Sequence, residues 1–232
     1  MADAVVGNGH YGSHHHILEI ERLTGGRILA APGKKCRLEQ MWFHSDTPTR
    51  TPQYFINCPF PPSILTQVHR DKELAIKPGF RHDLLLDLEK KKLVEGEWVK
   101  NEEISLGEKR ELLTVLDGFP WIAWAGMTPH GVHAAVYFNE WIPNSWSGQV
   151  VKWVGEQLEA AGYKGPVFID WSPSVNCNRP SRYIDEFAFW RPEVRLDASA
   201  AVTESRSVAE SRARSLRPPA TSAVQQHDRQ AG

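Results

Sequence analysis

The chain has 232 residues, of which 41% are hydrophobic, and its formal net charge at pH 7 is −1. This length and composition fit one globular domain better than two, and a net charge near zero provides no overall attraction to nucleic acid or to an anionic membrane. No apolar run approaches the roughly 18 residues that cross a bilayer. Its three cysteines form neither a C-x-x-C pair nor a disulfide framework. We therefore expect a soluble, cytoplasmic protein that does not bind membranes.

Both ends of the chain are expected to be flexible, namely residues 1–16 and 197–232. The side chains of three adjacent histidines at 14–16 would point in different directions on a helix or a strand, so they are poorly placed to bind one metal ion. From residue 197 onward there is no aromatic residue, and the composition offers too little apolar surface to offset the entropy of ordering. We predict a disordered C-terminal tail and a single domain over residues 17–196.

The first block of this domain predicts a small sheet. Its apolar and aromatic segments are separated by Gly, Pro and Ser/Thr turns and cover residues 27–31, 37–43 and 53–60. After Pro61 and Pro62, a short helix is expected at residues 63–74.

Residues 80–100, FRHDLLLDLEKKKLVEGEWVK, allow two interpretations. As a strand, the segment directs the even-numbered leucines to one face and Asp87 and Glu89 to the other, where residues two apart lie about 7 Å from each other. As a helix, Asp87 and Glu89 diverge by about 200° and share no face. Leucines and lysines suit a helix well, so the sequence leaves both interpretations open.

The second half of the chain alternates helices and strands. Ser105 and Glu108 have the spacing of a capping box, which begins a helix over 105–119. The remaining predicted elements are strands at 121–128 and 132–138 joined by a hairpin turn, a helix from a cap at Asn144 to a stop at Gly162, and a strand at 166–170. This order predicts an α+β domain with a mainly antiparallel sheet, helices on one face and the other face open.

Polar residues gather at the ends of these strands. On a strand, Asp87 and Glu89 could hold a hard cation such as Mg²⁺ or Mn²⁺. Asp170 ends the last strand, and Arg179 and Arg182 follow in a proline-broken loop that suits an anion. Structural explanations remain open for the same features: Asp170 as a turn residue, the two arginines as partners of Asp185 and Glu186, and His133 as a half-buried strand histidine.

The order of these features resembles the core of the archaeo-eukaryotic primase–polymerase superfamily, over about residues 80–195. The family's acidic pair on a strand is matched by Asp87 and Glu89, and its apolar-Asp motif by Ile169 and Asp170. Its serine-glycine-x-glycine-x-histidine hairpin is approached by Thr128, Gly131 and His133. The chain departs from that pattern with Thr128 for the usual serine, Pro129 for a common glycine and an additional His130.

The resemblance implies an RRM-like primase palm and template-dependent nucleotidyl transfer, as in a DNA primase or primase–polymerase of plasmid, phage or mobile-element replication. It implies that two Mg²⁺ or Mn²⁺ ions are held by Asp87, Glu89 and Asp170. It also implies that nucleotide is bound by Thr128, Gly131, His133, Arg179 and Arg182, and we expect Trp171 to stack on a base. Single-stranded DNA, NTP or dNTP, and a replicative helicase or initiator are the implied partners.

Three other functions stay open. A rolling-circle nickase of the HUH class needs two histidines on one strand face and a tyrosine, for which His130, His133 and Tyr163 are available, although here two residues separate the histidines instead of one. A non-catalytic single-strand-binding protein would keep its binding after Asp87→Ala or Asp170→Ala. A structural or interaction protein would fit the near-neutral charge. The sequence also leaves open whether residues 17–60 bind template, form a dimer interface or complete the core.

Overall fold

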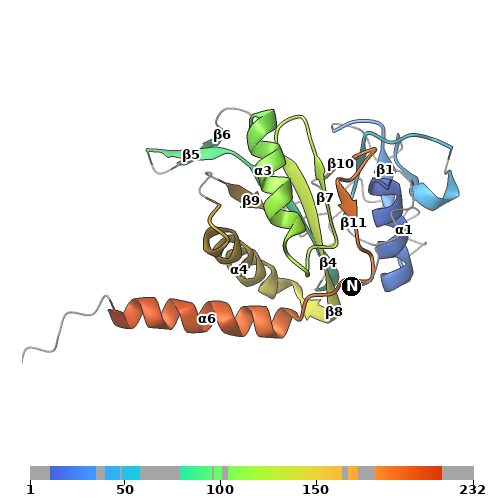
Figure 1. Ribbon diagram of the computed structural model, residues 1–232. Helices are drawn as coiled ribbons and strands as arrows, with labels where there is room; N and C mark the ends of the chain where they lie inside the picture. The colour runs from blue at the N-terminus through green and yellow to red at the C-terminus, as the bar shows by residue number, and fades with distance from the viewer. Residues whose placement is uncertain are drawn as a thin grey trace, which may run out of the picture.

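The centre of the protein is a five-stranded antiparallel sheet with the strand order β11-β7-β8-β4-β9. The computed structural model describes residues 11–34, 40–47, 49–57, 79–95, 97–100, 104–163, 167–171 and 181–215. The strands of this sheet are β4 (Phe80–Glu89), β7 (Trp124–Met127), β8 (Val132–Pro143), β9 (Phe168–Asp170) and β11 (Phe189–Trp190). Helix α3 (Leu106–Asp117) follows β4, and helix α4 (Ser147–Ala160) follows β8. The order β4-α3-β7-β8-α4-β9 is the βαββαβ order of an RRM-like domain, which confirms the predicted α+β class (Figure 1).

Strand β4 settles the ambiguity of residues 80–100 in favour of a strand. It pairs with β8 along one edge and with β9 along the other, so it is a central strand. Leu84, Leu86 and Leu88 pack among the helices, whereas Leu85 packs on the opposite face. Beyond it, β5 (Lys91–Val94) and β6 (Glu97–Lys100) form a two-stranded hairpin that projects from the sheet (Figure 1).

The hydrophobic core lies between the sheet and helices α3 and α4. Leu112 and Leu116 of α3 and Val150 and Val154 of α4 are fully buried there. The capping box that begins α3 is present, because Ser105 N donates to Glu108 Oε2 over 2.8 Å. Helix α4 begins later than predicted, since a short 3₁₀ turn, η3 (Asn144–Trp146), precedes it.

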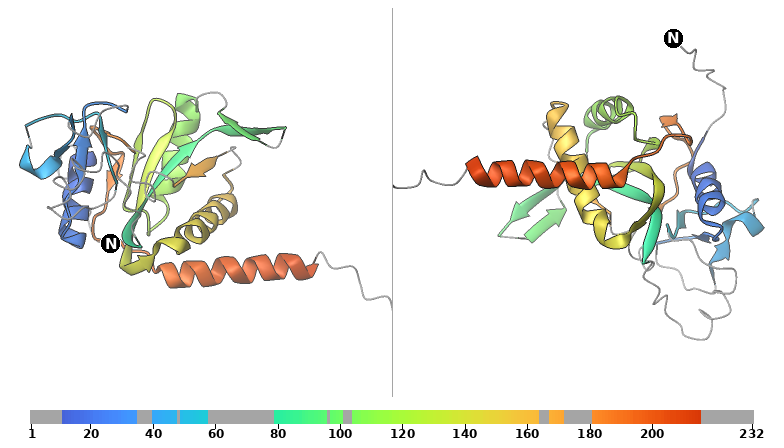
Figure 2. Two further views of the ribbon diagram at one scale, coloured as in Figure 1. Left: turned by 180° about the vertical axis from the view of Figure 1, so that it is seen from behind. Right: turned by 90° about the horizontal axis from the view of Figure 1, so that it is seen from below.

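A third helix on this face, α6 (Ala198–Ser215), corrects the prediction of a disordered tail from residue 197. Its first turns pack against α4, with Ala198, Ala201 and Val202 buried in the same core. Trp153 Nε1 of α4 donates to Glu204 Oε2 over 3.0 Å. The helix then extends beyond the body of the sheet domain (Figure 2), and residues 216–232 lie outside the described part of the chain.

The second face of the sheet is only partly open, which corrects another expectation. Helix α1 (Ser13–Thr24) and a four-stranded sheet of order β10-β3-β1-β2 cover the half that carries Leu85 (Figures 1 and 2). The small sheet comprises β1 (Leu29–Ala31), β2 (Trp42–Phe43), β3 (Tyr54–Phe55) and β10 (Ser181–Arg182). Residues 13–16, predicted to be flexible, thus belong to a helix in which Ser13 and His16 are fully buried. The predicted helix at 63–74 lies outside the described residues.

A buried polar network joins α1 to the central sheet. Trp124 Nε1 donates to His16 Nδ1 over 3.1 Å, so the ring proton is on Nε2, which lies 2.9 Å from Asn57 Oδ1. Asn57 Nδ2 in turn donates to Asp83 Oδ2 over 2.7 Å. Because buried polar groups are costly unless they are hydrogen-bonded, this network fixes the N-terminal segment in one orientation on the sheet.

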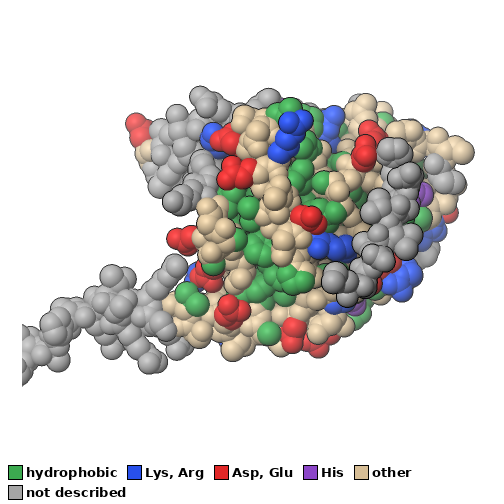
Figure 3. Space-filling model, in the orientation of Figure 1, with side chains coloured by type: hydrophobic (Ala, Val, Ile, Leu, Met, Phe, Trp, Pro, Cys, Tyr) green, Lys and Arg blue, Asp and Glu red, His purple; other side chains and the backbone are tan. Residues whose placement is uncertain are grey.

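The outer surface of the helical face mixes residue types. In Figure 3 acidic side chains are scattered over this face around apolar side chains. None of the helices in the described ranges has the length and apolar character needed to cross a membrane.

Candidate functional site

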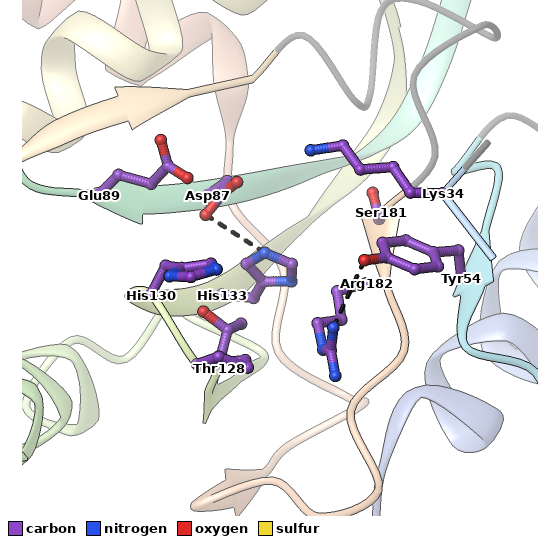
Figure 4. Close-up of a pocket in the computed structure, with 10 residues that line it drawn as sticks. Lys34, Tyr54, Asp87, Glu89, Thr128, His130, His133, Ser181 and Arg182 are labelled. Atoms are coloured by element: carbon purple, nitrogen blue, oxygen red, sulfur yellow. Dashed lines mark hydrogen bonds and ion pairs between the residues drawn. The ribbon is translucent and has the colours of Figure 1, made fainter. Parts of the chain in front are cut away.

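A hollow of about 250 Å³ lies at the end of β4, where α1 and the small sheet leave the second face uncovered. Both sheets and the β7–β8 hairpin contribute to its walls (Figure 4). The lining residues are Lys34, Tyr54, Asp87, Glu89, Thr128, Pro129, His130, His133, Ser181 and Arg182. This hollow therefore gathers five of the residues predicted from sequence to form a site, namely Asp87, Glu89, Thr128, His133 and Arg182.

Strand pairing brings the predicted carboxylates onto one face. Asp87 of β4 is the register partner of Asp170 on β9, and directly opposite residues on antiparallel strands have Cβ atoms about 5 Å apart. Glu89, two residues further along β4, faces the same way as Asp87. Like charges directly opposite each other are destabilising in a sheet. A cation near these side chains would relieve that repulsion.

His133 lies on the other side of Asp87. It is the register partner of Asp87 on β8, and its Nε2 is 3.2 Å from Asp87 Oδ1 (Figure 4). The side chain is 6% exposed, and its Nδ1 has no hydrogen-bond partner within the described part of the chain. Asp87 therefore stands between a carboxylate on one neighbouring strand and an imidazole on the other.

The turn between β7 and β8 is closed by two hydrogen bonds. Thr128 N donates to Gly131 O over 2.9 Å, and Gly131 N donates to the Thr128 hydroxyl over 2.9 Å. A Cβ atom at Gly131 would stand 2.1 Å from the carbonyl oxygen of Leu88, so only glycine fits this close approach to β4. The turn is thus held against the strand that carries Asp87 and Glu89.

The small sheet supplies the basic side of the hollow. Arg182 of β10 is the register partner of Tyr54 on β3, and its Nη1 donates to the Tyr54 hydroxyl over 3.4 Å. Lys34, just after β1, extends its amino group toward β4 (Figure 4). Sequence reasoning missed Lys34, Tyr54 and Ser181, because the pairing of β3 with β10 joins residues more than 120 positions apart. The only sequence signal was a lysine pair in the segment APGKK.

Of the predicted residues within the described ranges, Trp171 and Tyr163 lie away from this hollow, and Asp170 and Gly131 adjoin its lining residues without being among them. Arg179 lies outside the described residues. Trp171 packs against the core on the helical side, where its ring is 3.6 Å from the place of a Cβ on Gly148 of α4, and it does not line the hollow. Tyr163, required by the nickase alternative, lines a different hollow beside α4, away from His130 and His133.

The carboxylates near the hollow are possible ligands for a divalent metal ion. Asp87, Glu89 and Asp170 offer oxygen donors, which Mg²⁺ and Mn²⁺ prefer. Across the described ranges, no three His, Cys, Asp or Glu side chains converge closely enough to hold a metal ion by themselves. Mg²⁺ is usually held by one or two carboxylates together with water and substrate phosphates. The pair Asp87 and Asp170 therefore fits such an ion when phosphates complete its coordination.

Comparison with known proteins gives one similarity. No protein-family model matches the chain, and no curated protein matches it. Among solved structures, it is similar to the polymerase domain from Mycobacterium tuberculosis Ligase D in complex with DNA, with 12% sequence identity and a TM-score of 0.36. The alignment covers 84% of this chain and 86% of that chain. A TM-score this low does not establish a shared fold.

Proposed function

We propose that the hollow at the end of β4 catalyses metal-dependent nucleotidyl transfer onto a nucleic-acid strand, as in the primase–polymerase superfamily. One observation carries the proposal: Asp87 is in register with both Asp170 and His133, at a hollow that Lys34 and Arg182 also line. Acidic groups for a cation and basic groups for phosphates at one hollow match the needs of a nucleoside triphosphate.

Each side chain has a distinct task in this proposal. Asp87 and Asp170, with Glu89 beside them, would hold Mg²⁺ or Mn²⁺ together with phosphate oxygens, and the ion would neutralise phosphate charge and lower the pKa of the attacking 3′-hydroxyl. Lys34 and Arg182 bind the phosphates of the incoming nucleotide. His133 orients the carboxylate of Asp87 through the 3.2 Å contact and lines the hollow beside the phosphates of the bound nucleotide.

The substrate nucleic acid is proposed to be single-stranded DNA, with NTP or dNTP as the second substrate. The uncovered end of the sheet adjoins the hollow, so a template lying there would present its bases beside Asp87. Tyr54 lines the hollow, and the rings of tyrosine side chains stack on bases. It takes the role that the sequence suggested for Trp171.

The test is incorporation of labelled nucleotides on single-stranded DNA, with and without a primer, in Mg²⁺ or Mn²⁺. We expect the wild-type protein to extend DNA and the Asp170→Asn variant to lose at least about 100-fold in rate, since a carboxylate that holds the metal acts directly on the transferred phosphate. Glu140→Gln is the matched control, because it neutralises an exposed carboxylate on β8 outside the hollow. Its rate should equal that of the wild type.

Other outcomes identify the other functions. If the wild type incorporates nothing but binds single-stranded DNA as well as Asp170→Asn does, the protein is a binding module and the carboxylates are structural. If no salt-dependent DNA binding is found, a role in protein interaction is favoured instead.

A further inference from the structure

Lys109, in the first turn of α3, is a lysine at a buried position. Its residue surface is only 8% exposed, and a buried ammonium group is costly unless hydrogen bonds satisfy it. A positive charge near a helix N-terminus is also opposed by the helix dipole. The sequence therefore keeps a lysine at a position where helix and core would both favour an uncharged residue.

The ammonium group of Lys109 is satisfied by the turn that borders the hollow. Its Nζ donates to the carbonyl oxygen of Thr128 over 2.8 Å and to that of Pro129 over 2.7 Å. The described chain contains no cis peptide bond. In a trans peptide the N–H points opposite to the preceding carbonyl, so the N–H of His130 points away from Lys109.

The same turn is fixed from two further directions. Ile104 N donates to the carbonyl oxygen of His130 over 3.3 Å, and Gly131 lies directly against Leu88 of β4. Of these contacts, that of Lys109 is the one made by a charged side chain. It adds a fixed positive charge beside the turn, and this charge would attract an anionic substrate in the hollow that the turn lines.

We propose that Lys109 is a positioning residue: it holds the β7–β8 turn so that Thr128, His130 and His133 face the phosphates of a nucleotide bound beside Asp87. The inference rests on the proposed function for its substrate. The anchoring of the turn by Lys109, however, can be measured without any activity.

The test compares Lys109→Met, which preserves side-chain length but removes charge and donors, with Lys109→Arg and with Arg110→Met. Arg110 is the next residue of α3 and is exposed, so its variant controls for the loss of one positive charge. In Lys109→Met we expect faster hydrogen exchange in peptides spanning residues 128–133 and a loss of about 10- to 100-fold in kcat/KM, because small misplacements of a site are costly to catalysis. The KM for the nucleotide should rise while the KM for DNA stays constant, and Lys109→Arg should recover part of the loss.

The outcomes separate this inference from the proposed function. If the wild type incorporates no nucleotide, the proposed function fails, and the role of Lys109 is then decided by comparing hydrogen exchange and Mg²⁺-ATP binding between the wild type and the variants. The proposal would be overturned if Lys109→Met and Arg110→Met showed the same hydrogen-exchange rate in the β7–β8 turn and the same affinity for Mg²⁺-ATP. A loss of kcat alone, with thermal stability lowered and the nucleotide KM unchanged, would show a purely structural lysine and would also overturn it.

Discussion

At the scale of single residues, Gly131 makes the most demanding contact at the site. A Cβ there would lie 2.1 Å from Leu88 O, so Gly131→Ala must push the turn away from β4. We expect this variant to lose about 1–3 kcal/mol in the free energy of unfolding, as overpacked positions do, and to lose nucleotide incorporation. Urea denaturation and the incorporation assay measure the two effects.

The matched control is Gly107→Ala in α3. A Cβ at Gly107 would meet no atom within 4 Å, so alanine should stabilise the helix by about 0.5–1 kcal/mol. Equal urea midpoints for Gly131→Ala and the wild type would contradict the close packing of the turn on β4.

The residues of the hollow differ in how far the sequence could predict them. Asp87 and Glu89 share a face if their segment is a strand, which the sequence left open, and His133 is suggested only by the resemblance to the primase–polymerase hairpin. Trp171 follows the last residue of β9, so strand alternation does not fix its direction, and it packs on the helical side. Lys34 and Tyr54 could not be found this way, since local periodicity carries no information about which distant strands pair.

At the scale of elements, β4 shows why its own sequence was ambiguous. A central strand is buried on both faces, so the run of three leucines at 84–86 lacks the apolar–polar alternation that marks a half-exposed strand. The deciding factor is pairing with β8 and β9, which uses both edges of the strand. Tertiary pairing therefore overrode the helical propensity of leucine.

Helix α6 was missed for a different reason. Its buried residues, Ala198, Ala201, Val202 and Ser205, do follow a helical spacing of i, i+3, i+4 and i+7. Three of the four are alanine or serine, so the segment has few large apolar side chains and its composition resembles that of a disordered tail. Small residues nevertheless allow close packing against α4.

We expect this packing to be sensitive to charge at Val202. Val202→Asp buries a carboxylate in the core shared with α4, which should lower the free energy of unfolding by about 2–4 kcal/mol. Thr203→Asp, at the adjacent exposed position, introduces the same charge and should change stability by less than about 0.5 kcal/mol. Thermal denaturation of the two variants checks the difference, and similar midpoints would mean that α6 does not dock on α4 in solution.

At the scale of the whole molecule, one sheet serves two purposes. Its helical face forms the main core, while the second face is divided between a buried half under α1 and a hollow that carries the polar residues. The N-terminal segment therefore completes the fold and contributes to the site, since Lys34 and Tyr54 both come from it. The sequence raised the first role as one of several possibilities but gave no means to choose among them.

This arrangement buries two histidines, so protonation of their rings is disfavoured in the folded protein. Burial lowers the pKa of His16, and the opposing influence of Asp83 and Glu19 does not outweigh it. Burial, and next the neighbouring His14, lowers the pKa of His44 to about 4. His44 Nε2 lies 2.7 Å from His14 Nδ1, so the two rings share one proton between α1 and the 3₁₀ turn η2 (His44–Asp46).

The free energy of unfolding should consequently fall as pH drops below about 6.5, the ordinary pKa of histidine. Below that pH the unfolded chain binds protons that the folded chain does not, and each such proton contributes about 1.4 kcal/mol per pH unit. Urea denaturation measures how steeply the free energy of unfolding falls between pH 6 and 5. This slope should be smaller by about one proton in His44→Gln than in the wild type, and it should also be smaller in His16→Gln. Glu108→Gln is the control and should leave this slope unchanged. The hydrogen bonds of Ser105 hold the pKa of Glu108 at about 2, so titration of Glu108 changes the free energy of unfolding only below about pH 4.5. Equal slopes in all four proteins would mean that both histidines are accessible to protons in the native state, and hence that α1 and the small sheet do not stay docked on the second face.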